Sequence, residues 1–148
     1  MAFFPDDMPR PVPTMDDAGF WAGCSEKVLR FEACADCGTL RHPPTPVCPV
    51  CRSTAVEWRD APEEAEVYTY TVVHHASHPA VKSRLPYVGA VVIFPQMPGV
   101  RLVTNITDCD PSSISIGMPV RLWWDDIGGG MYVPRFRPTD APTTGDVP

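Results

Sequence analysis

Two short motifs decide the fold of this 148-residue chain: Cys34-Ala35-Asp36-Cys37-Gly38 and Cys48-Pro49-Val50-Cys51, with ten residues between Cys37 and Cys48. Each Cys-x-x-Cys motif makes a tight turn that brings two thiolates within reach of one metal ion. The glycine after Cys37 favours the positive φ angle that such a turn requires. Two facing turns supply four sulfur ligands in a tetrahedron, the closed geometry of structural zinc. The spacing therefore predicts a zinc ribbon with Cys34, Cys37, Cys48 and Cys51 as ligands.

Other chemistry at the same cysteines is less consistent with the pattern. A redox Cys-x-x-Cys needs a single pair in a βαβ setting, and the sequence shows no such setting. Iron in the same four-sulfur cage is the remaining alternative, which a colourless protein would exclude. Because four thiolates leave no coordination position for water, we expect the metal to be structural rather than catalytic.

After the ribbon, five segments have the composition of β-strands, and Gly- and Pro-rich connections separate them. The expected strands are residues 66–74, 87–94, 100–106, 119–124 and 131–136. In the strand 100–106, alternation turns four residues inward: Val100, Leu102, Thr104 and Ile106. In the strand 66–74, alternation places four residues on one face: Val67, Thr69, Thr71 and Val73. Five strands without a helix-length pattern predict a small antiparallel barrel of the OB type.

A short amphipathic helix is expected before the ribbon, over residues 18–28, with Asp16 or Asp17 as its N-cap. Phe20, Trp21, Cys24 and Val28 form its apolar stripe. The two aromatic residues are interpreted either as core residues or as docking residues for a partner. The preceding arm holds four prolines, and the sequence leaves open whether it is loose or lies across a surface.

The whole chain is therefore expected to be mainly β, in four parts: an extended arm (1–15), helix plus zinc ribbon (16–60), OB-type barrel (61–138) and flexible tail (139–148). The 19 prolines disfavour long helices, because each internal proline removes a hydrogen-bond donor. No apolar run is long enough to span a membrane, and the start of the chain lacks the pattern of a signal peptide. With cysteines in metal-binding spacing, these features predict a cytoplasmic protein.

Net charge bears on the kind of partner. The chain carries a formal charge of −6, whereas proteins that bind nucleic acids are usually basic. Residues 27–59 hold five basic and three acidic residues, so the ribbon adds little positive charge. OB barrels and zinc ribbons do bind single-stranded nucleic acid in other proteins, and that function is kept as one alternative. The acidity favours a partner that is not a nucleic acid, and no membrane partner is expected.

Residues that could perform catalysis are few. Cys109 lies between Asp108 and Asp110, whose charges should raise its pKa and make it a poor nucleophile. Cys24 lies on the apolar stripe of the expected helix. His74 and His75 are adjacent on a strand and point to opposite faces. We therefore predict no catalytic residue in this chain.

An ordered set of features resembles a known family. In chain order, they are Phe20-Trp21, the two cysteine motifs, the intervening Pro43-Pro44, Glu57-Trp58, the strand from Val67 to Thr71, Pro86-Tyr87, and the segment from Ile116 to Val120. The resemblance extends over about residues 20–135. The set resembles the acyl-CoA-associated OB-fold proteins known as domain of unknown function 35 (DUF35), in which a rubredoxin-like zinc ribbon precedes the barrel.

The resemblance implies a partner protein. Members of that family accompany thiolase-superfamily enzymes, including thiolases, acyltransferases and the aldolases of steroid side-chain degradation, and others accompany MaoC-type hydratases. The partner supplies the catalytic residues, and the small subunit scaffolds it and helps to enclose the acyl-CoA. Because thiolase-fold enzymes dimerise, a heterotetramer is expected. A free-standing acyl-CoA-binding protein is the other alternative.

Contacts to such a partner or ligand are expected at two places. Lys82 and Arg84 form a basic pair in the loop 77–86 and are the candidates for contact with acyl-CoA or with the partner. Trp21 and one member of the pair Trp123-Trp124 are candidate anchors, because alternation turns one of the paired tryptophans outward.

Overall fold

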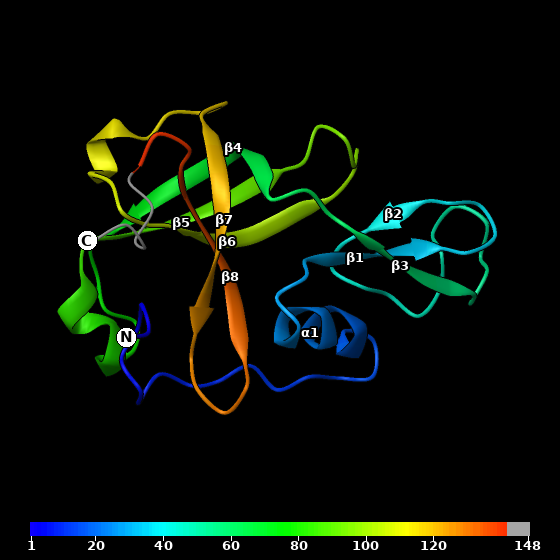
Figure 1. The fold of residues 1–148 in the computed structure, drawn as a ribbon, viewed down its shortest axis with the longest axis horizontal. Helices are drawn as coiled ribbons and strands as arrows, with labels where there is room; N and C mark the ends of the chain where they lie inside the picture. The colour runs from blue at the N-terminus through cyan, green and yellow to red at the C-terminus, as the bar shows by residue number, and fades with distance from the viewer. Residues whose placement is uncertain (142–148) are drawn as a thin grey trace, which may run out of the picture.

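The computed structural model describes residues 1–141, in which a small sheet and a five-stranded barrel lie side by side (Figure 1). The elements are α1 (Ala18–Ser25), β1 (Arg30–Cys34), β2 (Leu40–Arg41), β3 (Val56–Asp60), β4 (Glu64–Val73), η1 (Pro79–Arg84), β5 (Tyr87–Ile93), β6 (Arg101–Ile106), η2 (Pro111–Ser113), β7 (Pro119–Asp126) and β8 (Tyr132–Pro138). The order confirms the expected helix, ribbon and five-stranded barrel. Among residues 1–141, no helix has the length and apolar content needed to cross a membrane.

The ribbon sheet has the order β2-β1-β3, and both pairings are antiparallel. A buried ion pair ties its central and edge strands together, since Nη2 of Arg41 lies 2.9 Å from Oε1 of Glu32. The other oxygen of Glu32 accepts a 2.8 Å hydrogen bond from the amide of Thr45. Glu32 thus fixes the segment that leads from one cysteine motif to the other.

The barrel closes in the order β4-β5-β6-β8-β7, and β7 pairs back onto β4. The sequence predicted a barrel with antiparallel strands throughout. That prediction was wrong for one pair, because β6 and β8 run parallel. Strand directions cannot alternate around a closed ring of five, so at least one neighbouring pair must be parallel. That pair meets at a single register position, Ile106 opposite Phe136, and a hydrogen bond of 2.9 Å from the Thr104 hydroxyl to the Pro134 carbonyl bridges it further along.

Strand alternation is confirmed in β6 and broken in β4. Val100, Leu102, Thr104 and Ile106 are buried, as predicted. In β4 the register shifts between Val67 and Thr69, which pair with the consecutive residues Val92 and Val91. Such a bulge reverses the facing of the residues that follow it. Val67 is therefore buried whereas Thr69 and Thr71 are exposed, so the prediction that they share one face was wrong.

The helix is shorter than expected, because α1 ends at Ser25 rather than at Val28. The chain turns there: Lys27 has a φ of 58°, and the amide of Val28 donates to the carbonyl of Gly23. Asp17 occupies the N-cap position but makes no capping hydrogen bond. Its Oδ1 instead accepts a 2.6 Å hydrogen bond from the amide of Thr14, which anchors the arm to the helix.

One apolar core extends from the helix through the base of the ribbon into the barrel. Its aromatic rings form a chain in which centroids lie 6.4 Å apart for Phe20 and Phe31, 5.2 Å for Phe31 and Phe94, and 6.2 Å for Phe94 and Phe136. Phe20 is therefore a core residue, which confirms the first of the two interpretations for this side chain.

The N-terminal arm lies across the outside of the barrel (Figure 1). There, Asp125 and Arg135 form an ion pair on the outward face of β7 and β8. Both are nevertheless buried, at 1% and 6% exposure. The amide of Phe3 donates to Asp125, and the rings of Phe3 and Phe4 lie about 5 Å from the Arg135 guanidinium. The arm thus covers a polar cluster. At the other end of the chain, most of the predicted tail (139–148) lies outside the described residues.

Candidate functional site

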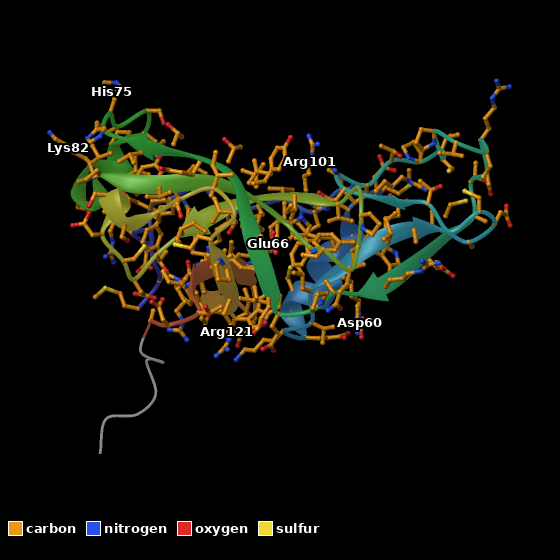
Figure 2. The ribbon with its side chains drawn as sticks, turned by 90° about the horizontal axis from the view of Figure 1, so that it is seen from above. Asp60, Glu66, His75, Lys82, Arg101 and Arg121 are labelled. Carbon is orange, nitrogen blue, oxygen red and sulfur yellow. The ribbon has the colours of Figure 1, made fainter. Side chains whose placement is uncertain are left out.

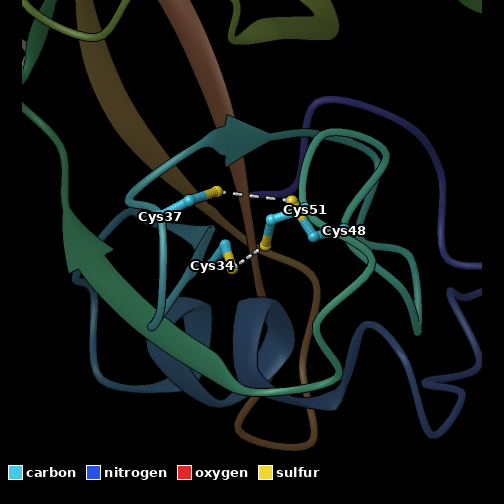
Figure 3. A group of neighbouring side chains, drawn as sticks. All are labelled: Cys34, Cys37, Cys48 and Cys51. Atoms are coloured by element: carbon cyan, nitrogen blue, oxygen red, sulfur yellow. Dashed lines mark hydrogen bonds between the residues drawn. The ribbon is translucent and has the colours of Figure 1, made fainter.

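The four cysteines of the ribbon come together at its outer end (Figure 3). Their sulfur atoms all lie within 4.8 Å of one another. The Sγ atoms of Cys34 and Cys51 are 3.5 Å apart, and those of Cys37 and Cys48 are 3.6 Å apart. Tetrahedral zinc with Zn–S bonds of about 2.3 Å requires sulfur–sulfur separations of roughly 3.8 Å. The four cysteines are thus positioned to bind a metal ion, consistent with structural zinc.

The two cysteine turns have matching backbones. The amide of Gly38 donates to the carbonyl of Cys34, and the amide of Arg52 donates to the carbonyl of Cys48, each at 2.9 Å. Gly38 has a φ of 77° and Arg52 has a φ of 63°. The second turn therefore places a non-glycine residue in the left-handed region that glycine occupies in the first.

Backbone amides prepare two of these thiols, Cys34 and Cys48, for a metal. The amide of Cys37, followed by that of Asp36, lowers the pKa of Cys34. The amide of Cys51, followed by that of Val50, lowers the pKa of Cys48 to about 6. Because a metal binds the thiolate form, amides directed at sulfur favour binding at neutral pH. With four sulfur ligands, the ion would have no position left for a water molecule.

The remaining cysteines lie apart from this cluster. Burial, and then the charges of Asp108 and Asp110, raises the pKa of Cys109. Burial raises the pKa of Cys24 to about 12. Both thiols are therefore protonated near neutral pH, as expected for poor nucleophiles.

The predicted basic pair lies at the end of the barrel away from the ribbon, where Figure 2 labels Lys82. Both residues belong to η1, but their surroundings differ. Lys82 is exposed, whereas Arg84 is half-buried and donates to the carbonyl of Ala2. The structure thus brings Arg84 to the N-terminal arm and leaves Lys82 facing solvent. Nearby, Nδ1 of His78 accepts the amide of Ala80 and caps η1.

The two candidate anchor positions are both partly buried. Trp21 packs against the core, and its indole donates to Asp17 over 3.3 Å. Of the pair in β7, Trp124 packs against the core and Trp123 faces outward, as alternation requires. The indole of Trp123 donates to the hydroxyl of Thr107 over 2.9 Å.

Sequence reasoning missed the polar cluster under the arm. Arg135 pairs with Asp125 and also donates from Nη1 to Oδ1 of Asn105. These residues come from three strands, so no spacing within the sequence relates them. An outward-facing pair of opposite charges on adjacent strands was the one available signal, and it resembles ordinary surface charge.

Comparisons with known proteins divide the chain into the same two parts, the ribbon and the barrel. The model of the ChsH2 rubredoxin-like zinc ribbon domain matches residues 21–57, and that of the ChsH2 C-terminal OB-fold domain matches residues 58–125. A DUF35 domain-containing scaffold protein of Methanocaldococcus jannaschii is 39% identical over 72% of this chain and 79% of its own length. The chain belongs to the DUF35 family. This membership confirms the resemblance inferred from the sequence.

Two further relatives are much longer than this chain. The "probable enoyl-CoA hydratase alpha subunit" of Thermomonospora curvata is 42% identical over 88% of this chain, which spans 40% of that relative. The "3-oxo-4,17-pregnadiene-20-carboxyl-CoA hydratase alpha subunit" of Mycobacterium tuberculosis is 38% identical over 82% of this chain, which spans 38% of it. This chain therefore spans about two-fifths of those proteins.

Among solved structures, a chain of the "Ltp2-ChsH2(DUF35) aldolase" superposes with a TM-score of 0.79 and 41% identity, over 87% of this chain and 98% of that one. A DUF35 protein from Sulfolobus solfataricus superposes with a TM-score of 0.59 at 18% identity and shows the fold alone.

Proposed function

We propose that this chain is a non-catalytic accessory subunit of a thiolase-superfamily enzyme complex that acts on acyl-CoA substrates. The similarity to 98% of the DUF35 chain in the two-component aldolase carries the proposal. That chain is close to this one in length, fold and sequence. The naming of archaeal relatives as scaffold proteins supports the same role.

The chemistry of the chain agrees with a scaffolding role. A metal ion held by Cys34, Cys37, Cys48 and Cys51 has no open position, so it would stabilise the ribbon and would not activate water. Cys24 and Cys109 have raised pKa values and are poor nucleophiles. In this proposal, the partner supplies the reacting groups.

For the contact surface, we propose Trp21 and the outward-facing Trp123 as anchors. Large aromatic side chains at the centre of an interface commonly contribute most of the binding energy. Lys82 remains the basic residue proposed to contact acyl-CoA or the partner, because its side chain is exposed. Arg84 is assigned a lesser share, since it already donates to the arm. The expected assembly is a heterotetramer with two copies of each subunit.

A hydratase complex is the second candidate. Two relatives with 42% and 38% identity are named as alpha subunits of CoA-thioester hydratases, and this observation favours it. Because this chain spans about two-fifths of those proteins, it covers their zinc-ribbon and barrel part only. In this case too, the chain would be an accessory part of an acyl-CoA enzyme.

Reconstitution tests the proposal and separates its two forms. The chain, a candidate thiolase-fold partner from the same organism, and the mixture of the two are each assayed for acyl-CoA turnover. We expect turnover from the mixture, little from the partner and none from the chain. Turnover by the chain alone would contradict the proposal, and activation of a hydratase instead of a thiolase-fold enzyme would select the second candidate.

A further inference from the structure

The seam between β6 and β8 opens into a cleft. Because these parallel strands pair only at Ile106 and Phe136, they leave space on the side that faces the helix. A cavity of about 420 Å³ lies there, between these strands, α1 and the segment 42–44. We call this cavity the seam cleft. Its wall is mainly apolar and is formed by Phe20, Trp21, Pro43, Pro44, Val103 and Val133.

His42 lines the seam cleft, and its ring lies in an unusual environment. The ring centroid lies 5.1 Å from both Phe20 and Phe31. Its Nδ1 atom is buried without a hydrogen-bond partner. Burial lowers the pKa of His42 to about 4, so the ring is neutral at pH 7. Packing alone would be served by phenylalanine, which has no buried nitrogen to leave unpaired.

The position of the proton on His42 follows from these contacts. An N–H group enclosed by aromatic rings without an acceptor is rarer and more costly than an enclosed lone pair. The proton is therefore assigned to Nε2. Within the described residues, Nε2 has no partner and is not buried, so its N–H group is available to the cleft.

Arg135 also lines the cleft, but its guanidinium belongs to the polar cluster under the arm. Its Nε atom donates to Asp125 and its Nη1 atom donates to Asn105. The rings of Phe3 and Phe4 lie about 5 Å from it. Because Asp125 balances the charge of Arg135, the residue adds no net positive charge to the cleft.

We propose that the seam cleft binds an uncharged, largely apolar small molecule through a carbonyl oxygen, which accepts a hydrogen bond from Nε2 of His42. A donor that faces an apolar cavity favours an acceptor on the ligand. An anion is disfavoured by the carboxylate of Asp17, which also lines the cleft. A cation is disfavoured because the two oxygens of Asp17 already accept hydrogen bonds from Thr14 and Trp21, and Nε2 of His42 cannot accept one. Trp21 also belongs to the contact surface proposed for the partner, so the test uses this chain without a partner.

A pair of matched probes tests the proposal on the full, zinc-loaded chain labelled with ¹⁵N. Acetophenone offers a ring and a carbonyl, and α-methylstyrene replaces that oxygen with a CH₂ group of similar shape. We expect acetophenone to shift the signals of the Trp21 indole and the Gly89 amide in a saturable manner. It should bind about fivefold more tightly than α-methylstyrene, the ratio typical of one neutral hydrogen bond.

His42→Phe keeps the aromatic packing and removes the donor. We expect this variant to bind acetophenone and α-methylstyrene about equally. The control His75→Phe changes an exposed histidine and should keep the preference for acetophenone near fivefold. In the wild-type chain, acetophenone should also shift the ¹⁵N signal of Nε2, which tests the contact without any variant. Equal binding of the two probes, no saturable shift, or an unchanged Nε2 signal would overturn the proposal.

Discussion

Compared with the barrel, the outer part of the ribbon buries little apolar surface. Between residues 35 and 55, only Arg41 and Cys48 are buried. In the barrel, by contrast, Val92, Val120 and Phe136 are fully enclosed in a continuous core. A segment with so few buried apolar groups cannot offset the conformational entropy of folding by itself. The ribbon should therefore depend on metal ligation, and the barrel on packing.

The largest expected effect tests the ribbon side of this comparison. Cys48→Ser removes a buried ligand, and the lost metal-binding free energy is on the order of 10 kcal/mol. We expect zinc loss and rapid amide exchange in residues 35–55, with β5 and β6 still protected. Cys109→Ser, a cysteine outside the cluster, is the control and should keep one zinc per chain. If Cys48→Ser kept both its zinc and the slow amide exchange of residues 35–55, the dependence on metal would be refuted.

The next effect tests the barrel side. Phe94→Ala removes a ring that lies between Phe31 and Phe136 at the centre of the core. Urea unfolding should show a loss of about 3–5 kcal/mol, while the folded protein retains its zinc. Val103→Ala, at a side chain that is 78% exposed, should change stability by less than about 0.5 kcal/mol. Zinc loss from the folded Phe94 variant would mean that the two regions are not independent.

A smaller effect concerns the junction between the two regions, where His42 lies. Its folded-state pKa of about 4 is below the usual value near 6.5, so the unfolded chain binds the extra proton between these pH values. Stability should therefore fall by up to about 3 kcal/mol as the pH decreases from 6.5 to 4. His42→Phe should remove this share of the pH dependence in urea titrations at pH 7 and 4.5. Identical pH profiles for the variant and the wild type would contradict the assigned burial.

The smallest effect compares the two cysteine turns. Arg52→Gly should relieve a left-handed backbone and stabilise the ribbon by about 0.5–1 kcal/mol, whereas Gly38→Ala should destabilise it by about 1 kcal/mol. Competition with a zinc chelator measures both changes as opposite shifts in affinity. Shifts in the same direction would show that the two turns are not equivalent.

Local patterns in the sequence predicted much of this molecule. The spacing of four cysteines was sufficient for the metal centre, because ligands so close in sequence leave few geometries open. Apolar alternation in 100–106 predicted the inward residues of β6, since no bulge interrupts that strand. The positions of the five barrel strands followed from composition and turn residues alone.

Long-range features escaped prediction for a physical reason. The bulge at Tyr68 depends on pairing with β5, and the burial of Asp125 depends on an arm more than one hundred residues away. The environment of His42 is set by Phe20 and Phe31, from a helix and a strand that precede it in the chain. None of these contacts leaves a periodic signal in the sequence.

The central claim is that this chain works as a subunit. Co-expression with a candidate thiolase-fold partner from the same organism, followed by size-exclusion chromatography with light scattering, measures this directly. We expect one species whose mass corresponds to two copies of each chain, and Trp123→Ala should weaken its association by roughly 2 kcal/mol. Separate elution of the two proteins at micromolar concentration would contradict the claim.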